Sequence, residues 1–401
     1  MLYRKMPKNG DELSVLGFGC MRLPMVEGHI DEARAIAQIR GAIDNGVNYV
    51  DTAWPYHGGE SEPLLGLALK DGYRERVKVA TKLPTWLIAS RADMDRYLNA
   101  QLERLGTDHI DYYLVHSLDG VSWDRVEALG IRDFLDQAKK DGRIVNAGFS
   151  FHGLAEDFKR IVDAYPWVFC QIQYNFLDRE YQAGTDGLQY AASKGMGVVV
   201  MEPLRGGNLG LPTAPPAVAA IWNEAKTKRP PAEWALRWVW NHPEVTVVLS
   251  GMNEEAHIEQ NLAVAGQAQA DSLTAKELDL VERAGRKYHE LMQVGCTGCG
   301  YCMPCPSGVK IPNCFDFFNK MHMFGNVAES KFMYIAFGSG MAGNSEPGFA
   351  SQCVACGTCL EKCPQHLAIP DFLERVAAEM EGPNFQEQMA AIQEHFTAGL
   401  K

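Results

Sequence analysis

Four residues with acid–base side chains lie at or just beyond short apolar runs in the first third of the chain. They are Asp51 in VDTAWPY, Tyr56 in the same segment, Lys82 in VATKLP and His116 in LVHS. Taken singly, each has an ordinary structural explanation: a helix cap, a solvated amine or a satisfied core histidine. Their shared position at the ends of consecutive predicted strands favours a joint role, since the active sites of parallel β/α barrels lie at those ends.

The four side chains also form a chemical set. A tyrosine has an ordinary pKa of about 10 and needs a nearby cation before it exchanges a proton at neutral pH. We therefore predict a catalytic site in which Tyr56 donates a proton and Lys82 supplies the charge. Asp51 would keep the lysine protonated and in place, and His116 would hydrogen-bond beside the oxygen that receives the proton.

Nine of the eleven cysteines fall between residues 296 and 363 of a long chain without a signal-peptide pattern. In a reducing compartment such clustering indicates metal binding rather than disulfides. The later run has the C-x2-C-x2-C-x3-C-P spacing of bacterial [4Fe-4S] ferredoxins, in which three thiolates face one cube and the fourth reaches a neighbouring cluster. Its cysteines are Cys353, Cys356, Cys359 and Cys363.

An earlier run also ends in Cys-Pro, although its last spacing is two residues rather than three. Its cysteines are Cys296, Cys299, Cys302 and Cys305. On the ferredoxin pattern the fourth cysteine of each run crosses to the other cluster, so two [4Fe-4S] clusters are predicted. Their ligands would be Cys296, Cys299, Cys302 and Cys363 for one, and Cys353, Cys356, Cys359 and Cys305 for the other. Zinc is the alternative, because paired C-x2-C knuckles also suit that metal.

Up to about residue 270 the chain alternates short β-branched or apolar runs with amphipathic helical stretches, which is typical of a repeated βα unit. Eight strands are predicted, at residues 15–18, 49–52, 77–81, 110–115, 144–149, 169–173, 197–201 and 245–249. Eight is the strand number of the (β/α)8 TIM barrel, so this α/β fold is expected, with the helices as its outer ring. Asn9 and Gly10 predict a hairpin that closes the bottom of the barrel.

The rest of the chain predicts a second domain. Residues 209–231 are rich in Pro and Ala and predict a loop with a helical insertion, while Thr274 and Glu277 could form a capping box. The stretch IPNCFDFFNKMHMFG between the cysteine runs predicts a helix, so a mainly helical, ferredoxin-like iron-sulfur domain is expected. We assign the barrel to residues 1–285 and the iron-sulfur domain to residues 286–401.

The composition narrows the class of partner. A formal net charge of −12 argues against nucleic acid or an anionic membrane surface, because both repel an acidic protein. The apolar share of 46% and the charged share of 22% are those of a soluble globular protein. No signal-peptide core or membrane-length apolar run is visible, so we predict a cytoplasmic protein.

The sequence resembles the aldo-keto reductase superfamily, and within it the branch with a C-terminal 4Fe-4S module. The resemblance spans nearly the whole chain and rests on LGFGCMRLP, DTAWPYHGGESE, VATKLP, LVHSLD, GFSFHG, QIQYNFLDRE, EPLRGGNLG, CTGCGYCMPCP and CVACGTCLEKCP. It implies NAD(P)H-dependent reduction of an aldehyde or ketone, or the reverse oxidation of an alcohol, without a Rossmann fold. The cofactor, NAD(H) or NADP(H), would lie across the top of the barrel.

The same resemblance implies a set of cofactor-binding residues. Ser150 and Gln171 match positions that bind the nicotinamide carboxamide, residues 203–207 match the pyrophosphate loop, and Asn261 matches an adenine-binding position. The full set is Gly19, Cys20, Met21, Asp51, Ser150, Gln171, Met201, Pro203, Leu204, Arg205, Gly207 and Asn261. The chain departs from the family at Phe151, where Asn is common, and at Met201, where an aromatic side chain usually stacks on nicotinamide.

The residues around the implied cofactor carry two further expectations. SGMNEEAHIEQN after the eighth predicted strand lacks the Lys or Arg that usually holds the 2'-phosphate of NADPH. Glu254 and Glu255 would repel a phosphate, so NADH is favoured. Side chains on loops and strand ends favour a hydrophobic or aromatic carbonyl substrate; they are Trp54, His57, Trp86, Phe151, His152 and Phe176.

Two alternatives stay open. A redox-responsive nicotinamide-binding protein without turnover has no need of the proton donor, so the complete set of acid–base residues favours an enzyme. A flavin at the barrel mouth could switch between hydride and single electrons, although no motif for it is visible. In the leading interpretation the clusters exchange electrons with a partner, such as a ferredoxin or a flavoprotein, or stabilise the fold.

Overall fold

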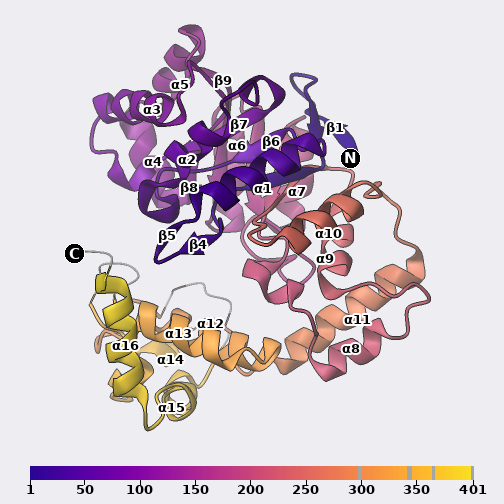
Figure 1. The fold of residues 1–401 in the computed structure, drawn as a ribbon. Coiled ribbons are helices and arrows are strands. Elements are labelled where there is room, and N and C mark those ends of the chain that lie inside the picture. Colours follow the sequence, from indigo (N-terminus) through magenta and orange to yellow (C-terminus); the bar gives the residue numbers. More distant parts are fainter. Residues whose placement is uncertain (297–299, 301, 341–345, 364–365, 399–401) are drawn as a thin grey trace. The chain divides into compact units, whose positions relative to one another are not determined.

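The computed structural model describes residues 1–296, 300, 302–340, 346–363 and 366–398. Its larger part is a closed barrel of eight parallel strands in the order β10-β11-β12-β3-β6-β7-β8-β9 (Figure 1). The strands are β3 (Leu16–Gly19), β6 (Tyr49–Asp51), β7 (Lys78–Leu83), β8 (Ile110–Leu118), β9 (Ile144–Phe151), β10 (Phe169–Gln173), β11 (Gly197–Met201) and β12 (Val245–Ser250). The predicted (β/α)8 TIM barrel is confirmed.

The strands read as nearly continuous apolar runs because both of their faces are covered, by barrel core on one side and helices on the other. Every residue of β10 and β12 is buried. The covering helices are α1 (Glu32–Asp44), α2 (Ser61–Ala68), α3 (Arg91–Leu105), α4 (Gly120–Ala128), α5 (Ile131–Lys140), α6 (Ala155–Ala164), α7 (Gly184–Ser193), α9 (Pro231–Trp240) and α10 (Glu255–Ala265). A short hairpin, β4 (Met25–Val26) and β5 (His29–Ile30), follows β3.

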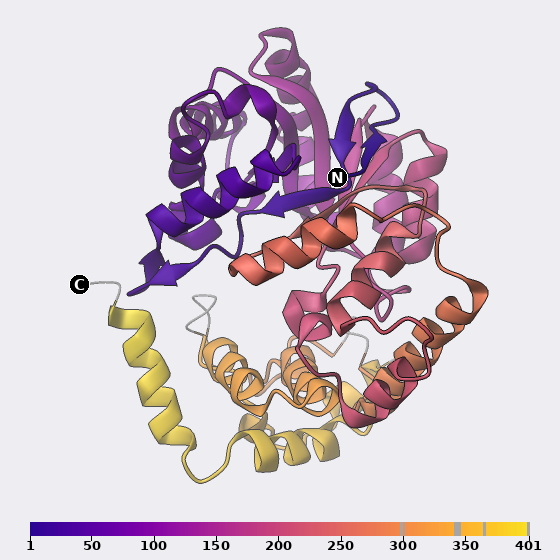
Figure 2. The ribbon, with the colours of Figure 1, turned by 45° about the vertical axis from the view of Figure 1, so that its right-hand side comes forward.

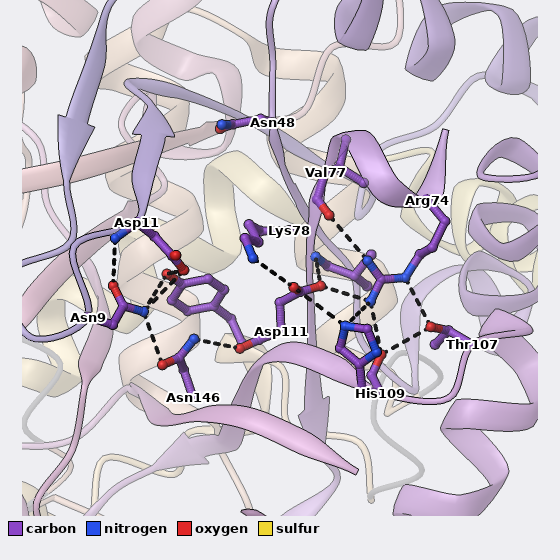
Figure 3. Close-up of polar contacts among 12 residues, drawn as sticks. Asn9, Asp11, Asn48, Arg74, Val77, Lys78, Thr107, His109, Asp111 and Asn146 are labelled. Carbon is purple, nitrogen blue, oxygen red and sulfur yellow. Dashed lines mark hydrogen bonds and ion pairs between the residues drawn. The ribbon is translucent and has the colours of Figure 1, made fainter. Parts of the chain in front are cut away.

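The N-terminal hairpin closes the amino-terminal end of the barrel, as predicted. It pairs β1 (Tyr3–Lys5) with β2 (Glu12–Ser14), and its turn residues point at the barrel strands (Figure 3). The Asn9 side-chain amide donates to the Tyr112 hydroxyl and to Asn146 Oδ1, both over 3.1 Å. The Tyr112 hydroxyl donates to Asp11 Oδ2 over 2.6 Å. These bonds fix the hairpin to β8 and β9.

A buried carboxylate organises the same end of the barrel. Asp111 at the start of β8 accepts the backbone N–H of Val79 over 3.0 Å and pairs with Arg74 at 2.9 Å and Lys78 at 3.3 Å (Figure 3). Its side chain is only 4% exposed. Because it lies at the amino-terminal ends of the strands, opposite the end where barrel chemistry takes place, this network stabilises the fold.

The chain divides into two compact units, residues 1–212 with 227–281, and residues 213–226 with 282–401. The second unit is helical, as expected, and the boundary at residues 285 and 286 stays a prediction. Its helices are α8 (Pro216–Trp222), the end of α11 (Ala275–Leu291), α12 (Ile311–Phe324), α13 (Val327–Gly338), α14 (Thr358–Lys362), α15 (Ile369–Met380) and α16 (Phe385–Ala398). Thr274 and Glu277 form the predicted capping box ahead of α11.

Helix α8 is the predicted insertion in residues 209–231, and it lies beside α11 in both views of the ribbon (Figures 1 and 2). Glu224, just beyond α8, accepts hydrogen bonds from both terminal nitrogens of Arg283 over 2.6 and 2.7 Å. The chain therefore contributes to the second unit twice, through residues 213–226 ahead of β12 and through the residues after 281. In the part of the chain that the structure describes, no helix is long and apolar enough to cross a membrane.

Candidate functional site

Three of the predicted catalytic side chains are hydrogen-bonded together at the carboxyl ends of β6 and β7. Lys82 Nζ donates to Asp51 Oδ1 over 2.7 Å and to the Tyr56 hydroxyl over 3.3 Å. It also donates to the backbone oxygen of Thr52 over 2.8 Å. The side chains of Lys82 and Asp51 are 1% and 3% exposed. Tyr56 begins the 3-10 helix η1 (Tyr56–Gly59), which directs the phenol back over the lysine.

His116 joins this group from β8. Its ring lies edge-on to that of Tyr56, with centroids 6.3 Å apart, and tilted against Trp86 at 5.1 Å. Its backbone oxygen accepts the Thr85 hydroxyl over 2.8 Å, which ties β8 to the turn after β7. The Nδ1 atom is buried without a hydrogen-bond partner among the described residues. The structure thus brings all four predicted residues to one place.

Burial and neighbouring charge set the protonation of these groups. Burial alone would lower the pKa of Lys82, but Asp51 and Tyr56 outweigh it and raise that pKa. Burial raises the pKa of Asp51 and that of Tyr56, while Lys82 opposes both shifts. Burial, and then the charge of Lys82, hold the pKa of His116 well below its ordinary range. At neutral pH the lysine is therefore protonated, and the phenol and imidazole are uncharged.

A buried polar network supports the lysine strand from behind, and no motif predicted it. Glu62 of α2 is fully buried, and its Oε1 accepts the Thr81 hydroxyl and the Gln101 amide, each over 2.7 Å. Its Oε2 accepts Arg104 over 3.1 Å. Gln101 also donates to the backbone oxygen of Lys82 over 3.0 Å. Because these groups have their hydrogen bonds satisfied inside the protein, they fix the strand that carries Lys82.

The side chains expected to line a substrate pocket differ in their exposure and in their contacts. Trp86 is 45% exposed and packs at a tilt against His116, as a pocket wall would. Phe151 is fully buried against Phe158, with ring centroids 5.1 Å apart, so it packs in the core. His57 accepts the backbone N–H of Leu23 at Nε2 over 3.1 Å, which ties η1 to the turn after β3.

Of the residues expected to bind the nicotinamide, Ser150 and Met201 lie at the carboxyl ends of β9 and β11, and Gln171 lies at the middle of β10. The Gln171 amide nitrogen contacts Met201 Sδ at 3.4 Å, and the Gln171 amide oxygen is buried without a partner among the described residues. The Ser150 hydroxyl accepts the backbone N–H of Ser117 over 2.8 Å. A buried amide oxygen that lacks a donor is costly, so Gln171 suits a ligand that brings an N–H group.

The turn expected to contact the cofactor after β3 is closely packed. Gly19 ends β3, and the backbone N–H of Cys20 donates to the backbone oxygen of Asp51 over 2.8 Å. Cys20 is fully buried, which raises the pKa of its thiol. Met21 is 58% exposed. The turn therefore presents one flexible apolar side chain beside the catalytic strand ends.

The predicted pyrophosphate loop runs from Pro203 through Leu204 into the 3-10 helix η4 (Arg205–Gly210). Gly206 and Gly207 have φ values of 70° and 103°, a left-handed conformation that suits glycine and brings the backbone close to a ligand. Arg205 Nε donates to Asp178 Oδ2 over 3.0 Å. The charge of this arginine is thus already offset by a carboxylate.

The acidic pair after β12 has a partner that no sequence motif indicated. Arg34 of α1 reaches Glu254 Oε2 and Glu255 Oε2, each at 2.6 Å, and holds the pKa of Glu255 down to about 2. One cation therefore offsets part of the charge of two carboxylates. Nearby, the Asn261 amide donates to the Ser250 hydroxyl over 2.9 Å, which holds α10 against the end of β12.

The described cysteines of both runs lie in the second unit. Burial raises the pKa of Cys359, and the neighbouring charges of Cys353, Cys305 and Cys356 raise it further. Cys305 of the earlier run and Cys353 of the later run both pack against the apolar cluster that contains Cys359. Cys299 lies outside the described residues. Within the described residues, no three possible ligand side chains already converge as a metal-binding group.

The other cysteine contacts separate ligand candidates from core residues. Cys356 is exposed, and its Sγ lies 3.5 Å from the Thr358 hydroxyl. Cys170 and Cys314 are 0% and 2% exposed, and burial raises both of their pKa values. Cys170 and Cys314 therefore behave as small core residues.

Helices of the second unit fix the backbone ahead of each cysteine run. Asn319 of α12 accepts both N–H groups of residues 293–294 over 2.9 Å and donates to the oxygen of residue 294 over 2.7 Å. Ahead of the later run, the N–H groups of residues 350–351 donate to the Tyr334 hydroxyl over 2.9 Å and to Glu381 over 3.1 Å. Tyr334 also donates to Glu381. Neither cysteine run begins from an unsupported loop.

Two family models match this chain. The model of the aldo/keto reductase family matches residues 15–284, and the model of a 4Fe-4S dicluster domain matches residues 295–368. L-galactose dehydrogenase of Arabidopsis thaliana is 28% identical over 299 residues, which are 70% of this chain and 92% of that protein. Aldo-keto reductase YhdN of Bacillus subtilis is 31% identical over 191 residues, which are 45% of this chain and 56% of that protein.

The barrel also matches solved structures. The holo form of aldo-keto reductase AKR11C1 from Bacillus halodurans has a TM-score of 0.60 and 27% identity, over 71% of this chain and 96% of that one. A thermostable aldo-keto reductase, Tm1743, in complex with the inhibitor epalrestat has a TM-score of 0.59 and 25% identity, over 71% of this chain and 100% of that one.

Proposed function

Because this chain belongs to the aldo/keto reductase family and carries a C-terminal 4Fe-4S dicluster domain, we propose that it is an NAD(P)H-dependent oxidoreductase of carbonyl compounds. It reduces an aldehyde or ketone, or oxidises the corresponding alcohol, and it holds two [4Fe-4S] clusters. The observation that carries the proposal is the hydrogen-bonded set of Asp51, Lys82 and Tyr56 beside His116 at the carboxyl ends of the barrel strands.

The four side chains divide the acid–base work. Tyr56 gives the proton of its hydroxyl to the carbonyl oxygen, because Lys82 donates to the phenol oxygen and stabilises the phenolate that is left. Asp51 keeps Lys82 charged inside the barrel. His116 is uncharged, so it acts as a hydrogen-bond donor to the substrate oxygen rather than as the source of the proton. When bound, the nicotinamide ring supplies the hydride.

The cofactor contacts follow from groups at the strand ends. Gln171 and Ser150 would hold the carboxamide, for which the unpartnered amide oxygen of Gln171 is suited. Residues 203–207 would hold the pyrophosphate. Glu254 and Glu255 still favour NADH over NADPH, because Arg34 offsets only part of their charge.

The cysteine arrangement supports two clusters with crossed ligands. The packing of Cys305 against the apolar cluster that contains Cys359 fits the ferredoxin pattern, in which the last cysteine of one run serves the cluster of the other. A donor set of eight thiols in two Cys-Pro-ended runs suits iron-sulfur clusters better than zinc. We propose that these clusters exchange single electrons with a ferredoxin or a flavoprotein.

The decisive experiment is anaerobic purification followed by iron, sulfide and released-cofactor analysis, combined with carbonyl turnover assays that use NADH and NADPH in parallel. Iron and sulfide near eight atoms each per chain, together with nicotinamide-dependent turnover, are expected. Zinc in place of iron would reject the clusters. Absence of turnover with either nucleotide across aliphatic and aromatic aldehydes would reject the reductase.

A further inference from the structure

Arg22 occupies a fixed position in the turn after β3, although it was not among the residues predicted to bind the cofactor. Before it, the backbone N–H of Cys20 donates to the backbone oxygen of Asp51 over 2.8 Å. After it, the N–H of Leu23 donates to His57 Nε2 over 3.1 Å. Both ends of the turn are therefore tied to the segment that carries the catalytic aspartate and tyrosine.

The side chain of Arg22 spans two loops at the carboxyl end of the barrel. Its stem lies over Gly251, just beyond β12, where a Cβ atom would come within 3.0 Å of Arg22 Cβ and 3.3 Å of its Cδ. Its Nη2 lies 3.4 Å from the position that a Cβ atom would take on Gly206. The guanidinium thus lies at the predicted pyrophosphate loop.

Arg22 differs from two other arginines at the carboxyl end of the barrel, whose charges are paired with carboxylates. Arg205 pairs with Asp178, and Arg34 pairs with the two glutamates after β12. Arg22 has no carboxylate partner among the described residues. A dinucleotide carries two negative charges on its diphosphate, and the planar fork of a guanidinium matches phosphate oxygens in a bidentate manner.

We propose that Arg22 binds the diphosphate of the nicotinamide dinucleotide, from the turn after β3 and across Gly206. This inference rests on the proposed function, and it adds a phosphate-binding residue that acts on cofactor affinity rather than on the chemical step. The competing explanation is that Arg22 only packs its aliphatic stem over Gly251.

The test compares Arg22→Met, which keeps an unbranched stem over Gly251, with the parent and with Arg160→Gln on the exposed face of α6. The dissociation constant for NADH is measured by fluorescence titration of the cluster-loaded protein at two salt concentrations. Arg22→Met should weaken NADH binding about ten- to hundredfold and reduce its salt dependence, because a charge-assisted contact is lost. At saturating NADH, kcat should stay within about twofold of the parent, and Arg160→Gln should bind as the parent does.

The outcomes separate this inference from the proposed function. If the parent binds NADH and Arg22→Met binds it equally well, Arg22 is a packing residue and the inference is wrong. If the parent binds neither NADH nor NADPH, the proposed function itself fails and the inference fails with it. Should Arg22→Met fold poorly, Arg22→Lys keeps the charge without the fork and should give an intermediate affinity; affinity equal to that of the parent would count against a bidentate contact.

Discussion

Replacing Lys82 with methionine should leave the Asp51 carboxylate inside the barrel without its counter-ion. The two side chains are 1% and 3% exposed and their nitrogen and oxygen atoms are 2.7 Å apart, so water cannot replace the lost partner. Removing one member of a buried ion pair lowers the free energy of unfolding by about 3–5 kcal/mol. Methionine has nearly the length of the lysine stem, so a cavity should add little to that loss.

The double variant Asp51→Asn with Lys82→Met removes both charges and should recover most of the stability, to within about 1–2 kcal/mol of the parent. The stability of the single variant should also depend more strongly on pH than that of the parent. Its Asp51 pKa rises further, because Lys82 no longer opposes the effect of burial. The folded carboxyl then binds a proton at pH values where the unfolded chain, with an ordinary pKa of about 3.9, has released it. The stability of the single variant therefore falls as the pH rises above about 4 toward the raised pKa of Asp51.

Urea unfolding followed by tryptophan fluorescence, with clusters loaded and oxygen excluded, measures these differences. Seven of the eight tryptophans lie in the barrel unit, so the signal reports mainly on the barrel. Equal destabilisation of the single and double variants would show that the unpaired charge of Asp51 is not what destabilises Lys82→Met. A pH profile of the single variant equal to that of the parent would mean that Asp51 has another counter-ion.

Four further predictions test the rest of the proposal. Tyr56→Phe should lower kcat for carbonyl reduction by about 100-fold or more with iron content unchanged, and activity within about threefold of the parent would reject the proton donor. Cys305→Ala should remove or convert the cluster of the later run, as seen by iron counting and electron paramagnetic resonance; loss of the other cluster would mean local ligation. Thr358→Val should lower the midpoint potential of that cluster in a redox titration, because a hydrogen bond to Cys356 sulfur favours the more negative reduced form, and an unchanged potential would contradict this role. In flavin-free protein, NADH should leave the clusters oxidised on the timescale of turnover, because a hydride carries two electrons and a cluster accepts one. A reduced-cluster signal that appears as fast as turnover in freeze-quenched electron paramagnetic resonance would disprove it.

The barrel and the acid–base residues could be predicted because both depend on local pattern. Each strand is a short apolar run, and the repeated βα order brings the carboxyl ends of consecutive strands together. Asp51, Lys82 and His116 could therefore be grouped without knowing any distance. Their catalytic roles stay predictions until the variants are measured.

The supporting contacts could not be predicted, because their partners are far apart in the chain and have no motif. Arg34 meets Glu254 and Glu255 across 220 and 221 residues. Glu62 and Gln101 belong to two helices whose facing sides are set only by packing. A carboxylate in the apolar helix SEPLLGLA was the one available signal for Glu62, since a buried charge needs partners.

The excursion of residues 213–226 bears on how the two units of this protein can be separated. The segment lies between β11 and α9 of the barrel, yet it clusters with residues 282–401. Val218, Ile221 and Trp222 on α8 are 0%, 8% and 7% exposed. A truncation after residue 281 would therefore remove residues 282–401 of the second unit. Residues 213–226 of the same unit would remain in the barrel chain, with the apolar face of α8 uncovered. The cysteine-bearing unit is interleaved with the barrel in the sequence, so a functional transplant of that unit onto a different barrel would need three junctions, at residues 212/213, 226/227 and 281/282, rather than one.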